Sequence, residues 1–188
     1  MKRGRIIAIS GLVASGKSTV AEKLSEILRA QVISSDVIRK RMAGIDPFSH
    51  IKCGYKKAIY SPSFTHRVYE SIIKTAVKEA KEGKDVIVDA TFSQKRYRDM
   101  LRCEAEKEKI PLFFFFLDTP EATIIERLRK REKERTVSDA DISVYLKMKE
   151  TYEYPQEDED VVVLKGDKRV EEIVEEILKT IKEGQNGF

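Results

Sequence analysis

Five short apolar runs along the 188-residue chain predict β-strands, and amphipathic stretches between them predict helices. The runs are rich in Ile, Val and Phe, and two of them, VIVDA and LFFFFL, show no alternation of polar and apolar positions. Continuous apolar runs of this length are typical of strands that are covered on both faces in a parallel sheet. The expected strands are residues 5–10, 31–35, 85–90, 111–118 and 160–166.

Helical periodicity and capping signals divide the rest of the chain. Ser61 followed by Pro62 predicts a helix start, and Gly83 predicts a helix end. The expected helices are residues 17–29, a short one from residue 36, 62–82, one from residue 120, 138–152 and 168–184, while residues 44–60 predict a mobile connection. Strands separated by helices in this order predict a single three-layer α/β/α domain over residues 1–188, with a five-stranded parallel sheet.

The segment GLVASGKS, residues 11–18, lies between the first expected strand and the first expected helix. It matches the phosphate-binding pattern GxxxxGK[ST] at every required position and in the required strand–loop–helix context. Its glycines let the backbone wrap around a phosphate, while N–H groups and the helix N-terminus direct positive charge at it. Lys17 is expected to neutralise the β- and γ-phosphates, and Ser18 to offer Mg²⁺ a hydroxyl ligand. The predicted nucleotide-binding residues of this loop are Gly11, Ala14, Ser15, Gly16, Lys17, Ser18 and Thr19.

Two motifs that are absent from the sequence limit which nucleotide is expected and which reaction is expected of it. Guanine is recognised through an NKxD-type segment, and Asn186 is the only asparagine in the chain, so ATP is favoured. Hydrolytic motors end a strand with Asp-Glu, where the Glu activates water, but here Asp89 is followed by Ala90. A transferase is therefore favoured over a hydrolase.

Phosphoryl transfer to a hydroxyl requires a base beside the acceptor, a group that holds the acceptor, and cations over the phosphoryl group. Asp36 follows the second expected strand, at the edge where open α/β sheets bind ligands, and Arg39 lies one helical turn later. Asp36 is expected to take the acceptor's proton and Arg39 to orient an anionic part of the acceptor. The alternative is a helix cap beside a solvent-exposed arginine. The arginines of residues 127–135 are candidates for a closing cation, and which of them reaches the phosphate stays open.

The chain resembles the P-loop kinases of the nucleoside-monophosphate-kinase type, and within them the AAA_33 group of zeta-toxin-like and polynucleotide-kinase-like proteins. The resemblance covers nearly the whole chain and rests on GLVASGKST, SSDVIRKRMAG, IYSPSFTHRVYE, VIVDATF, ERLRKR and VSDADISVY. It implies a P-loop NTPase fold with a helical lid over roughly residues 127–145, and the use of ATP and Mg²⁺.

The resemblance also implies roles on the nucleotide side. Arg127 and Arg131 match the RLxxR of nucleoside-monophosphate kinases, where the first arginine packs on the adenine and the second reaches the phosphates. Gly166 falls in the loop that contacts the adenine. Asp89 and Thr91 match the strand end DATF, a partner for Mg²⁺-bound water or the acceptor, and Asp89 is thus a candidate Mg²⁺ residue together with Ser18.

On the acceptor side, Asp36 and Arg39 align with the DxxR of polynucleotide 5′-hydroxyl kinases and adenylylsulfate kinases, which implies a general base and an acceptor-holding arginine. The further acceptor-specific segments of gluconate kinases and adenylylsulfate kinases are not found in this sequence. The second acidic residue of shikimate kinases is not found either. The resemblance therefore leaves the acceptor open.

Basic and aromatic residues near the expected acceptor edge favour a phosphorylated or polynucleotide acceptor, through phosphate neutralisation and base stacking. The alternative is ordinary helix surface in a chain rich in Arg and Lys. The leading expectation is a polynucleotide 5′-hydroxyl kinase. The other candidates are a kinase of a small nucleotide-like or phosphorylated metabolite, and an ATP-binding regulatory module with little transfer activity. The residues concerned are Lys95, Arg96, Arg98 and Arg102, with Tyr60, Arg67 and Tyr69.

Composition excludes several classes of protein. Lys and Arg number 36 against 32 Asp and Glu, and this near balance does not by itself predict binding to nucleic acid or to an anionic membrane. The two cysteines and two histidines are isolated in the sequence, which argues against a disulfide framework or a zinc site. No apolar run approaches the roughly 20 residues of a membrane helix. A cytoplasmic protein is expected, and abundant Glu and Lys with one Asn and no Trp favour a thermophilic source.

Overall fold

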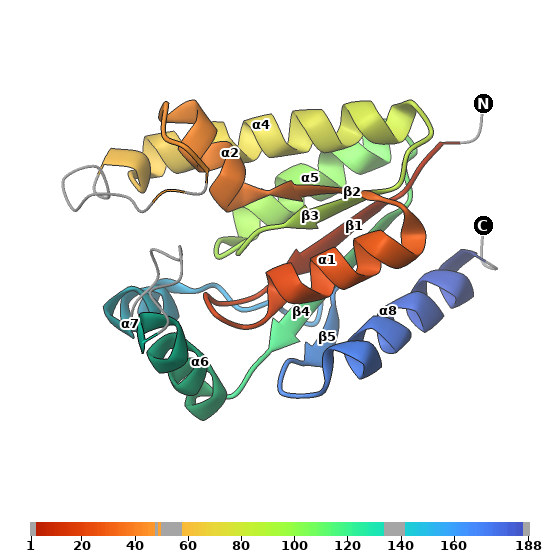
Figure 1. The fold of residues 1–188 in the computed structure, drawn as a ribbon. Helices are drawn as coiled ribbons and strands as arrows, with labels where there is room; N and C mark the ends of the chain where they lie inside the picture. The colour runs from red at the N-terminus through yellow and green to blue at the C-terminus, as the bar shows by residue number, and fades with distance from the viewer. Residues whose placement is uncertain (1–2, 48, 50–57, 134–141, 186–188) are drawn as a thin grey trace.

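The computed structural model describes residues 3–47, 49, 58–133 and 142–185, with a parallel sheet at the centre (Figure 1). The strands lie in the order β2-β3-β1-β4-β5, and every neighbouring pair runs parallel, so all strands end at the same edge. The five-stranded parallel sheet predicted from the sequence is confirmed. The strands are β1 (Ile6–Ser10), β2 (Gln31–Ser34), β3 (Val86–Asp89), β4 (Leu112–Asp118) and β5 (Val162–Lys165).

Helices cover both faces of this sheet. Figure 1 shows α4 and α5 on one face and α1 and α8 on the other, which confirms the predicted three layers. The described helices are α1 (Lys17–Leu28), α2 (Ser35–Met42), α4 (Pro62–Lys81), α5 (Lys95–Lys107), α6 (Glu121–Lys133), α7 (Ile142–Thr151) and α8 (Val170–Gln185).

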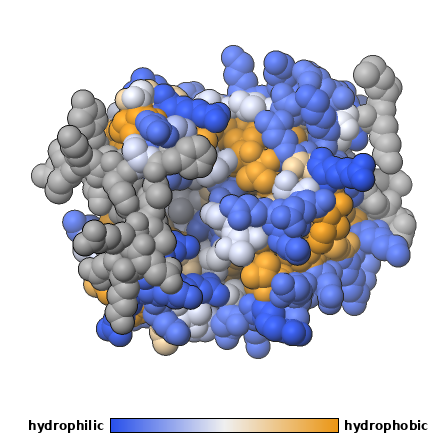
Figure 2. All heavy atoms as spheres, in the orientation of Figure 1, coloured by the Kyte–Doolittle hydropathy of each residue, from blue (hydrophilic) through white to orange (hydrophobic). Residues whose placement is uncertain are grey.

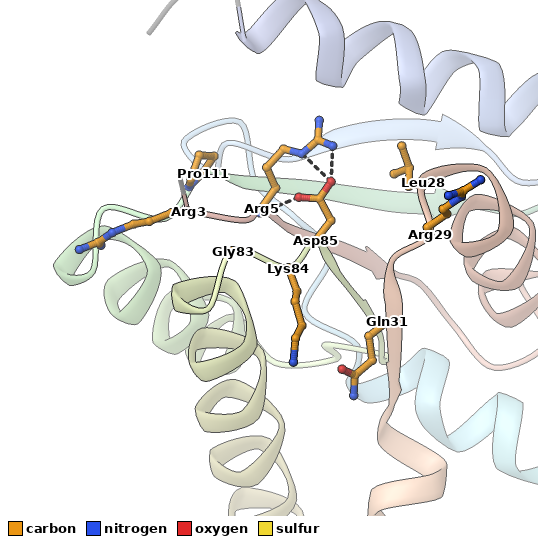
Figure 3. Close-up of a pocket in the computed structure, with 9 residues that line it drawn as sticks. All are labelled: Arg3, Arg5, Leu28, Arg29, Gln31, Gly83, Lys84, Asp85 and Pro111. Carbon is orange, nitrogen blue, oxygen red and sulfur yellow. Dashed lines mark hydrogen bonds and ion pairs between the residues drawn. The ribbon is translucent and has the colours of Figure 1, made fainter. Parts of the chain in front are cut away.

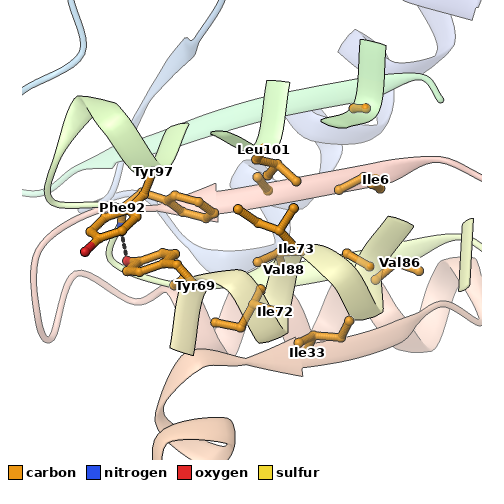
Figure 4. Packing of buried hydrophobic residues seen from close by; sticks show 14 of the residues in the cluster. Ile6, Ile33, Tyr69, Ile72, Ile73, Val86, Val88, Phe92, Tyr97 and Leu101 are labelled. Atoms are coloured by element: carbon orange, nitrogen blue, oxygen red, sulfur yellow. Dashed lines mark hydrogen bonds between the residues drawn. The ribbon is translucent and has the colours of Figure 1, made fainter. Parts of the chain in front are cut away.

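Alternate side chains of the central strand enter opposite cores. Ile6 and Ala8 of β1 pack with α4 and α5, whereas Ile7 and Ile9 pack with α1 and α8. All four side chains are fully buried. Because successive side chains point to opposite faces of a strand, a strand covered on both faces must be apolar at every position. Figure 4 shows the first of these cores from close by.

The ends of α4 follow from local capping. Ser61 Oγ accepts a hydrogen bond from the Phe64 amide at 3.4 Å, and Pro62 is the first residue of the helix, as predicted. The helix ends at Lys81, and Gly83 takes a left-handed φ of 90°, which favours glycine.

Three segments differ from the expected elements or lie partly outside the described residues. α5 is not among the helices that the pattern predicts, because most of its residues are charged. The helix expected over residues 138–152 is confirmed for Ile142–Thr151, and residues 134–141 lie outside the described residues. Within the connection expected over residues 44–60, residues 48 and 50–57 also lie outside them.

Helices α6 and α7 lie together beside the loop that follows β1 (Figure 1). A third core joins them to that loop and to β4, and it contains Leu12, Phe116, Leu128, Tyr145 and Tyr152. The two helices contain the described part of the region predicted as a lid. Among the residues coloured in Figure 2, hydrophilic ones predominate on the face shown, with apolar areas between them. Among the described helices, none is both long and apolar enough to cross a membrane.

Candidate active site

The loop after β1 has the backbone geometry of a phosphate cradle. Gly11, Ala14 and Gly16 take positive φ angles of 142°, 59° and 106°. A Cβ on Gly11 would lie 2.9 Å from both the Leu117 carbonyl oxygen and Ser15 Oγ, so no other residue fits there without a shift. Among the described residues, no side chain caps the N-terminus of α1 and no acidic residue occupies its first turn. The amide groups at that terminus are therefore available to an anion.

Lys17, the first residue of α1, is held inside this loop. Its Nζ donates to the Leu12 carbonyl at 2.7 Å and to Ser15 Oγ at 3.4 Å. The pKa of Lys17 is lowered to about 8, chiefly by burial; the carboxylate of Asp89 opposes this change and the positive charge of Arg131 adds to it. The predicted phosphate-binding lysine and the predicted lid arginine therefore act on one another electrostatically. A bound phosphate would restore the charge that burial disfavours.

Ser18 and Asp89, the two predicted Mg²⁺ ligands, are in direct contact. Ser18 Oγ donates to Asp89 Oδ2 at 2.7 Å, and Asp89 is buried at the end of β3. Burial raises the pKa of Asp89, while Lys17 and the Ser18 hydrogen bond oppose the rise. Among the described residues, no cluster of three or more His, Cys, Asp or Glu side chains could hold a metal. This hydroxyl and carboxylate fit Mg²⁺ of the kind that keeps several waters and binds nucleotide phosphates.

Arg127 of α6 joins the loop to the turn that follows β5. Its Nη1 donates to the Ser15 carbonyl at 2.8 Å and to the Ala14 carbonyl at 3.3 Å, and its Nη2 donates to the Gly166 carbonyl at 3.1 Å. Thr119 Oγ1 donates to the same Ser15 carbonyl at 3.0 Å. Arg127 and Gly166 thus meet beside the phosphate loop, and the contact of each with adenine, which the resemblance implies, stays a prediction.

Gly166→Ala is expected to weaken nucleotide binding, because a Cβ there would lie 1.8 Å from Thr119 Oγ1 and would displace the hydroxyl that holds the Ser15 carbonyl. We expect about a tenfold rise in the dissociation constant of a non-hydrolysable ATP analogue, measured by calorimetry, for a local shift of this kind. Gly44→Ala is the control for backbone strain without a clash, since Gly44 has a left-handed φ of 69° but nothing lies within 4 Å of a Cβ there. Equal dissociation constants for the two variants would contradict the prediction.

Asp36 and Arg39 both lie in α2, the helix that follows β2, but their side chains make different contacts. Asp36 is exposed, with 54% of its side chain accessible, and pairs with Lys40 Nζ at 3.2 Å. Arg39 is buried, and its Nη1 donates to the Ile59 carbonyl and to Thr65 Oγ1. Burial lowers the pKa of Arg39, and Asp36 is among the groups that oppose the change. The solvent-exposed arginine of the alternative interpretation is not found, and Arg39 links α2 to the start of α4.

Lys40 is a residue that the sequence analysis misses. It is 1% exposed, and besides Asp36 it contacts the Pro47 carbonyl at 3.3 Å. The only signal in the sequence is its position four residues after Asp36, a spacing that brings opposite charges together on a helix.

Arg98 corrects the expectation of an exposed basic acceptor surface on α5. Its side chain is 1% exposed and forms a bidentate pair with Glu159, with Nε at 2.6 Å and Nη2 at 2.7 Å from the carboxylate oxygens. The Arg98 hydrogen bonds lower the pKa of Glu159 to about 2. Arg98 therefore stabilises the fold and is not available to an acceptor in solution.

The other basic residues of α5 also have partners. Lys95 pairs with Asp99 at 3.2 Å, and Arg102 pairs with the same carboxylate at 3.1 Å. The Arg96 guanidinium lies 4.7 Å from the centre of the Tyr97 ring. Arg135, another candidate from the basic stretch, lies outside the described residues.

A cavity of about 510 Å³ lies near the amino-terminal ends of the strands, away from the phosphate loop. Arg5 and Asp85 meet in it, with Arg5 Nε 3.1 Å from Asp85 Oδ2 (Figure 3). Figure 3 shows Arg3 and Arg29 at opposite sides of the cavity, pointing away from each other. These cations do not converge on one point, and the cavity adds nothing to the site at the other edge.

The chain is similar to curated kinases and to longer proteins. It is 29% identical over 98 residues to an uncharacterised protein of Mycobacterium tuberculosis, a match that covers 52% of this chain and 20% of the relative. The match therefore spans about a fifth of that relative's length. The chain is also 23% identical over 205 residues to a thymidylate kinase of Vibrio vulnificus, which covers 94% of each.

Solved structures and a family model give the same picture of the fold. A gluconokinase from Sinorhizobium meliloti superposes with a TM-score of 0.67 at 24% identity, covering 95% of this chain and 92% of the other. An APS kinase from Mycobacterium tuberculosis superposes with a TM-score of 0.73 at 20% identity, covering 97% and 99%. The family AAA_33, described as an AAA domain, matches residues 6–155. The chain therefore belongs to the AAA_33 family, and it has the fold of the P-loop kinases.

Proposed function

We propose that this protein is an ATP-dependent kinase that transfers the γ-phosphoryl group of ATP to a hydroxyl group of a small molecule. One observation carries the proposal: the phosphate loop, the Ser18–Asp89 pair and the exposed carboxylate of Asp36 share one edge of the sheet. Ser34, the last residue of β2, pairs in register with Asp89, and Ile9 of β1 pairs with Asp89 from the other side. The charge of Asp36 contributes to the raised pKa of Asp89, so the two carboxylates are electrostatically coupled.

The chemistry assigns a task to each of these groups. The acceptor oxygen forms a bond to the γ-phosphorus, the bond between that phosphorus and the bridging oxygen breaks, and ADP leaves. Asp36 accepts the proton of the acceptor hydroxyl, and its exposure lets a substrate approach it. Lys17 and Arg131 stabilise the negative charge on the transferring group. Mg²⁺, when bound by Ser18 and Asp89, neutralises phosphate charge.

A small acceptor is favoured over a polynucleotide for two reasons. The similar proteins named above include a gluconokinase, an APS kinase and a thymidylate kinase, whose names specify small substrates. In addition, three of the four basic side chains of α5 that suggested nucleic acid are buried or paired, and the fourth, Arg96, lies over the Tyr97 ring. The comparisons give no support to the polynucleotide 5′-hydroxyl acceptor expected from the sequence.

The test is a transfer screen with γ-labelled ATP and Mg²⁺ against sugars, nucleosides, nucleoside monophosphates and 5′-hydroxyl oligonucleotides. Label is expected on one class of small molecule. Label on the oligonucleotide alone would establish the polynucleotide kinase instead. ATP binding without label on any acceptor would favour the ATP-binding module.

Asp36→Asn is expected to lower kcat for the labelled acceptor by about 100-fold, because the carboxylate that takes the proton is lost. Asp99→Asn is the matched control, since Asp99 is also an exposed helical aspartate paired with a lysine four residues away. The dissociation constant of an ATP analogue should stay unchanged in both variants. Equal kcat values in the two variants would contradict the assignment of Asp36 as the general base.

A further inference from the structure

The turn that follows β3 is held in an uncommon conformation. Phe92 is not glycine, yet it takes a left-handed φ of 47° and is fully buried. Its amide donates to Tyr69 Oη of α4 at 2.8 Å, a contact that Figure 4 shows as a dashed line. The Tyr69 hydroxyl also lies 3.3 Å from Thr91 Oγ1. Such a conformation persists only where surrounding contacts determine it, so the turn is positioned by its neighbours.

The Thr91 carbonyl joins this turn to the phosphate loop and to the region after α7. It accepts a hydrogen bond from the Gly11 amide at 3.4 Å and a shorter one from Tyr152 Oη at 2.6 Å. Tyr152 is the residue that follows α7, and its ring packs in the same core as Leu12 of the loop. Burial raises the pKa of Tyr152, so its hydroxyl stays protonated at neutral pH.

The segment that follows Tyr152 is hydrogen-bonded to the start of α5 and to the residues just before it. These contacts restrict movement of the Tyr152 hydroxyl away from the Thr91 carbonyl. The Glu153 amide donates to the Ser93 carbonyl at 2.9 Å, and Glu153 Oε2 accepts from the Lys95 amide at 2.6 Å. Arg98 Nη1 donates to both the Glu153 and Phe92 carbonyls at 2.8 Å. Hydrogen bonds therefore join the residues that follow the C-terminus of α7 to the turn after β3.

We propose that Tyr152 is a positioning residue of the transfer site, whose hydroxyl holds the Thr91 carbonyl against Gly11 and so sets the distance between the phosphate loop and Asp89. Asp89 lies two residues before Thr91, and its carboxylate binds Ser18 of the loop. Without the Tyr152 hydroxyl, the Thr91 carbonyl keeps, among the described residues, only the long contact with the Gly11 amide. The turn and the loop can then move apart, and the γ-phosphate loses its alignment with the acceptor.

The test compares Tyr152→Phe with Tyr145→Phe. Tyr145 lies in the same core, is also buried, and uses its hydroxyl on Glu121 at 2.9 Å, so its variant loses an equivalent hydrogen bond away from the turn. In Tyr152→Phe we expect kcat to fall about tenfold while KM for ATP stays within about twofold. In Tyr145→Phe kcat should be unchanged. A merely structural role would lower the melting temperature of both variants and leave kcat alone.

This kinetic comparison rests on the proposed function, so a second measurement works without any acceptor. Hydrogen–deuterium exchange with a non-hydrolysable ATP analogue should show faster exchange in peptides that contain Gly11 and Phe92 in Tyr152→Phe only. If no acceptor is found, faster exchange there still supports the inference while the proposed function fails. If exchange or kcat in Tyr152→Phe matches that in Tyr145→Phe, the inference is overturned whether or not the protein is a kinase.

Discussion

Lys17→Met is expected to lower phosphoryl transfer by about 10³-fold, because the ammonium group that neutralises the transferring phosphate is lost from a buried site. The loop already holds this lysine through the Leu12 carbonyl and Ser15 Oγ, so its position is prepared before ATP binds. Single-turnover rates with labelled ATP measure the loss. Lys23→Met is the control, since Lys23 lies on the same helix with 46% of its side chain exposed and pairs only weakly with Glu26 in solvent. Comparable losses in the two variants would contradict the assignment.

The pH dependence of ATP binding gives an independent check on Lys17. Its pKa of about 8 in the free protein means that the side chain loses its proton as the pH rises above 8. Phosphate favours the charged form, so binding of an ATP analogue at pH 9 should take up protons, and affinity should fall as the pH rises from 7 to 9. Calorimetry in buffers of different ionisation enthalpy measures the uptake. In Lys17→Met the uptake should vanish, and an unchanged uptake would assign the proton to another group.

Glu159→Gln is expected to destabilise the fold by about 3–5 kcal/mol, the cost of removing one partner from a buried ion pair. Both side chains of the Arg98–Glu159 pair are 1% exposed, so the Arg98 guanidinium would be left without its carboxylate and away from water. Urea unfolding measures the loss. Glu108→Gln is the control, because its partner Lys81 is exposed and the expected change is within about 1 kcal/mol. A loss in Glu159→Gln no larger than in this control would contradict the prediction.

Two further measurements identify the charge as the cause. Arg98→Met with Glu159→Leu should recover part of the stability lost in Glu159→Gln, because no unpaired charge is left in the Arg98–Glu159 site, although the Phe92 and Glu153 carbonyls lose their hydrogen bonds from Arg98. The pKa of Glu159 is lowered from 4.5 to about 2 in the folded protein, so its contribution is complete above pH 4.5 and is lost as the pH falls towards 2. The difference in unfolding free energy between wild type and Glu159→Gln should shrink over that range. A difference that stays constant would show that packing, not charge, is responsible.

The structure also revises what the basic residues of α5 do. In the sequence, Lys95 and Arg98 stand close to Asp89 and indicate a surface for phosphates. In the fold, Arg98 points into the protein because Glu159, 61 residues further along the chain, lies there to meet it. A pattern of charged residues does not reveal which of them has a distant partner. The hypothesis of a nucleic-acid acceptor therefore loses Arg98 as a contact, whereas Arg67 and Arg96 are exposed.

The sequence by itself determined the strands and the phosphate loop. A strand that is buried on both faces must be apolar throughout, and a loop that wraps a phosphate needs glycine, lysine and serine at fixed spacing, so both signals are contained in a few consecutive residues. The same holds for the start of α4, where Ser61 and Pro62 are neighbours. These interactions are local, and adjacent residues are sufficient to specify them.

Only the tertiary structure decided how the parts of the site are held together. The contacts of the Thr91 carbonyl with Gly11 and Tyr152, of Arg127 with Gly166, and of Arg98 with Glu159 join residues that are 39 or more positions apart. These contacts depend on the order of the strands within the sheet, and the Tyr152 contact also depends on where α7 ends. Hydroxyl and guanidinium groups can meet many partners, and the packing of the three layers selects one.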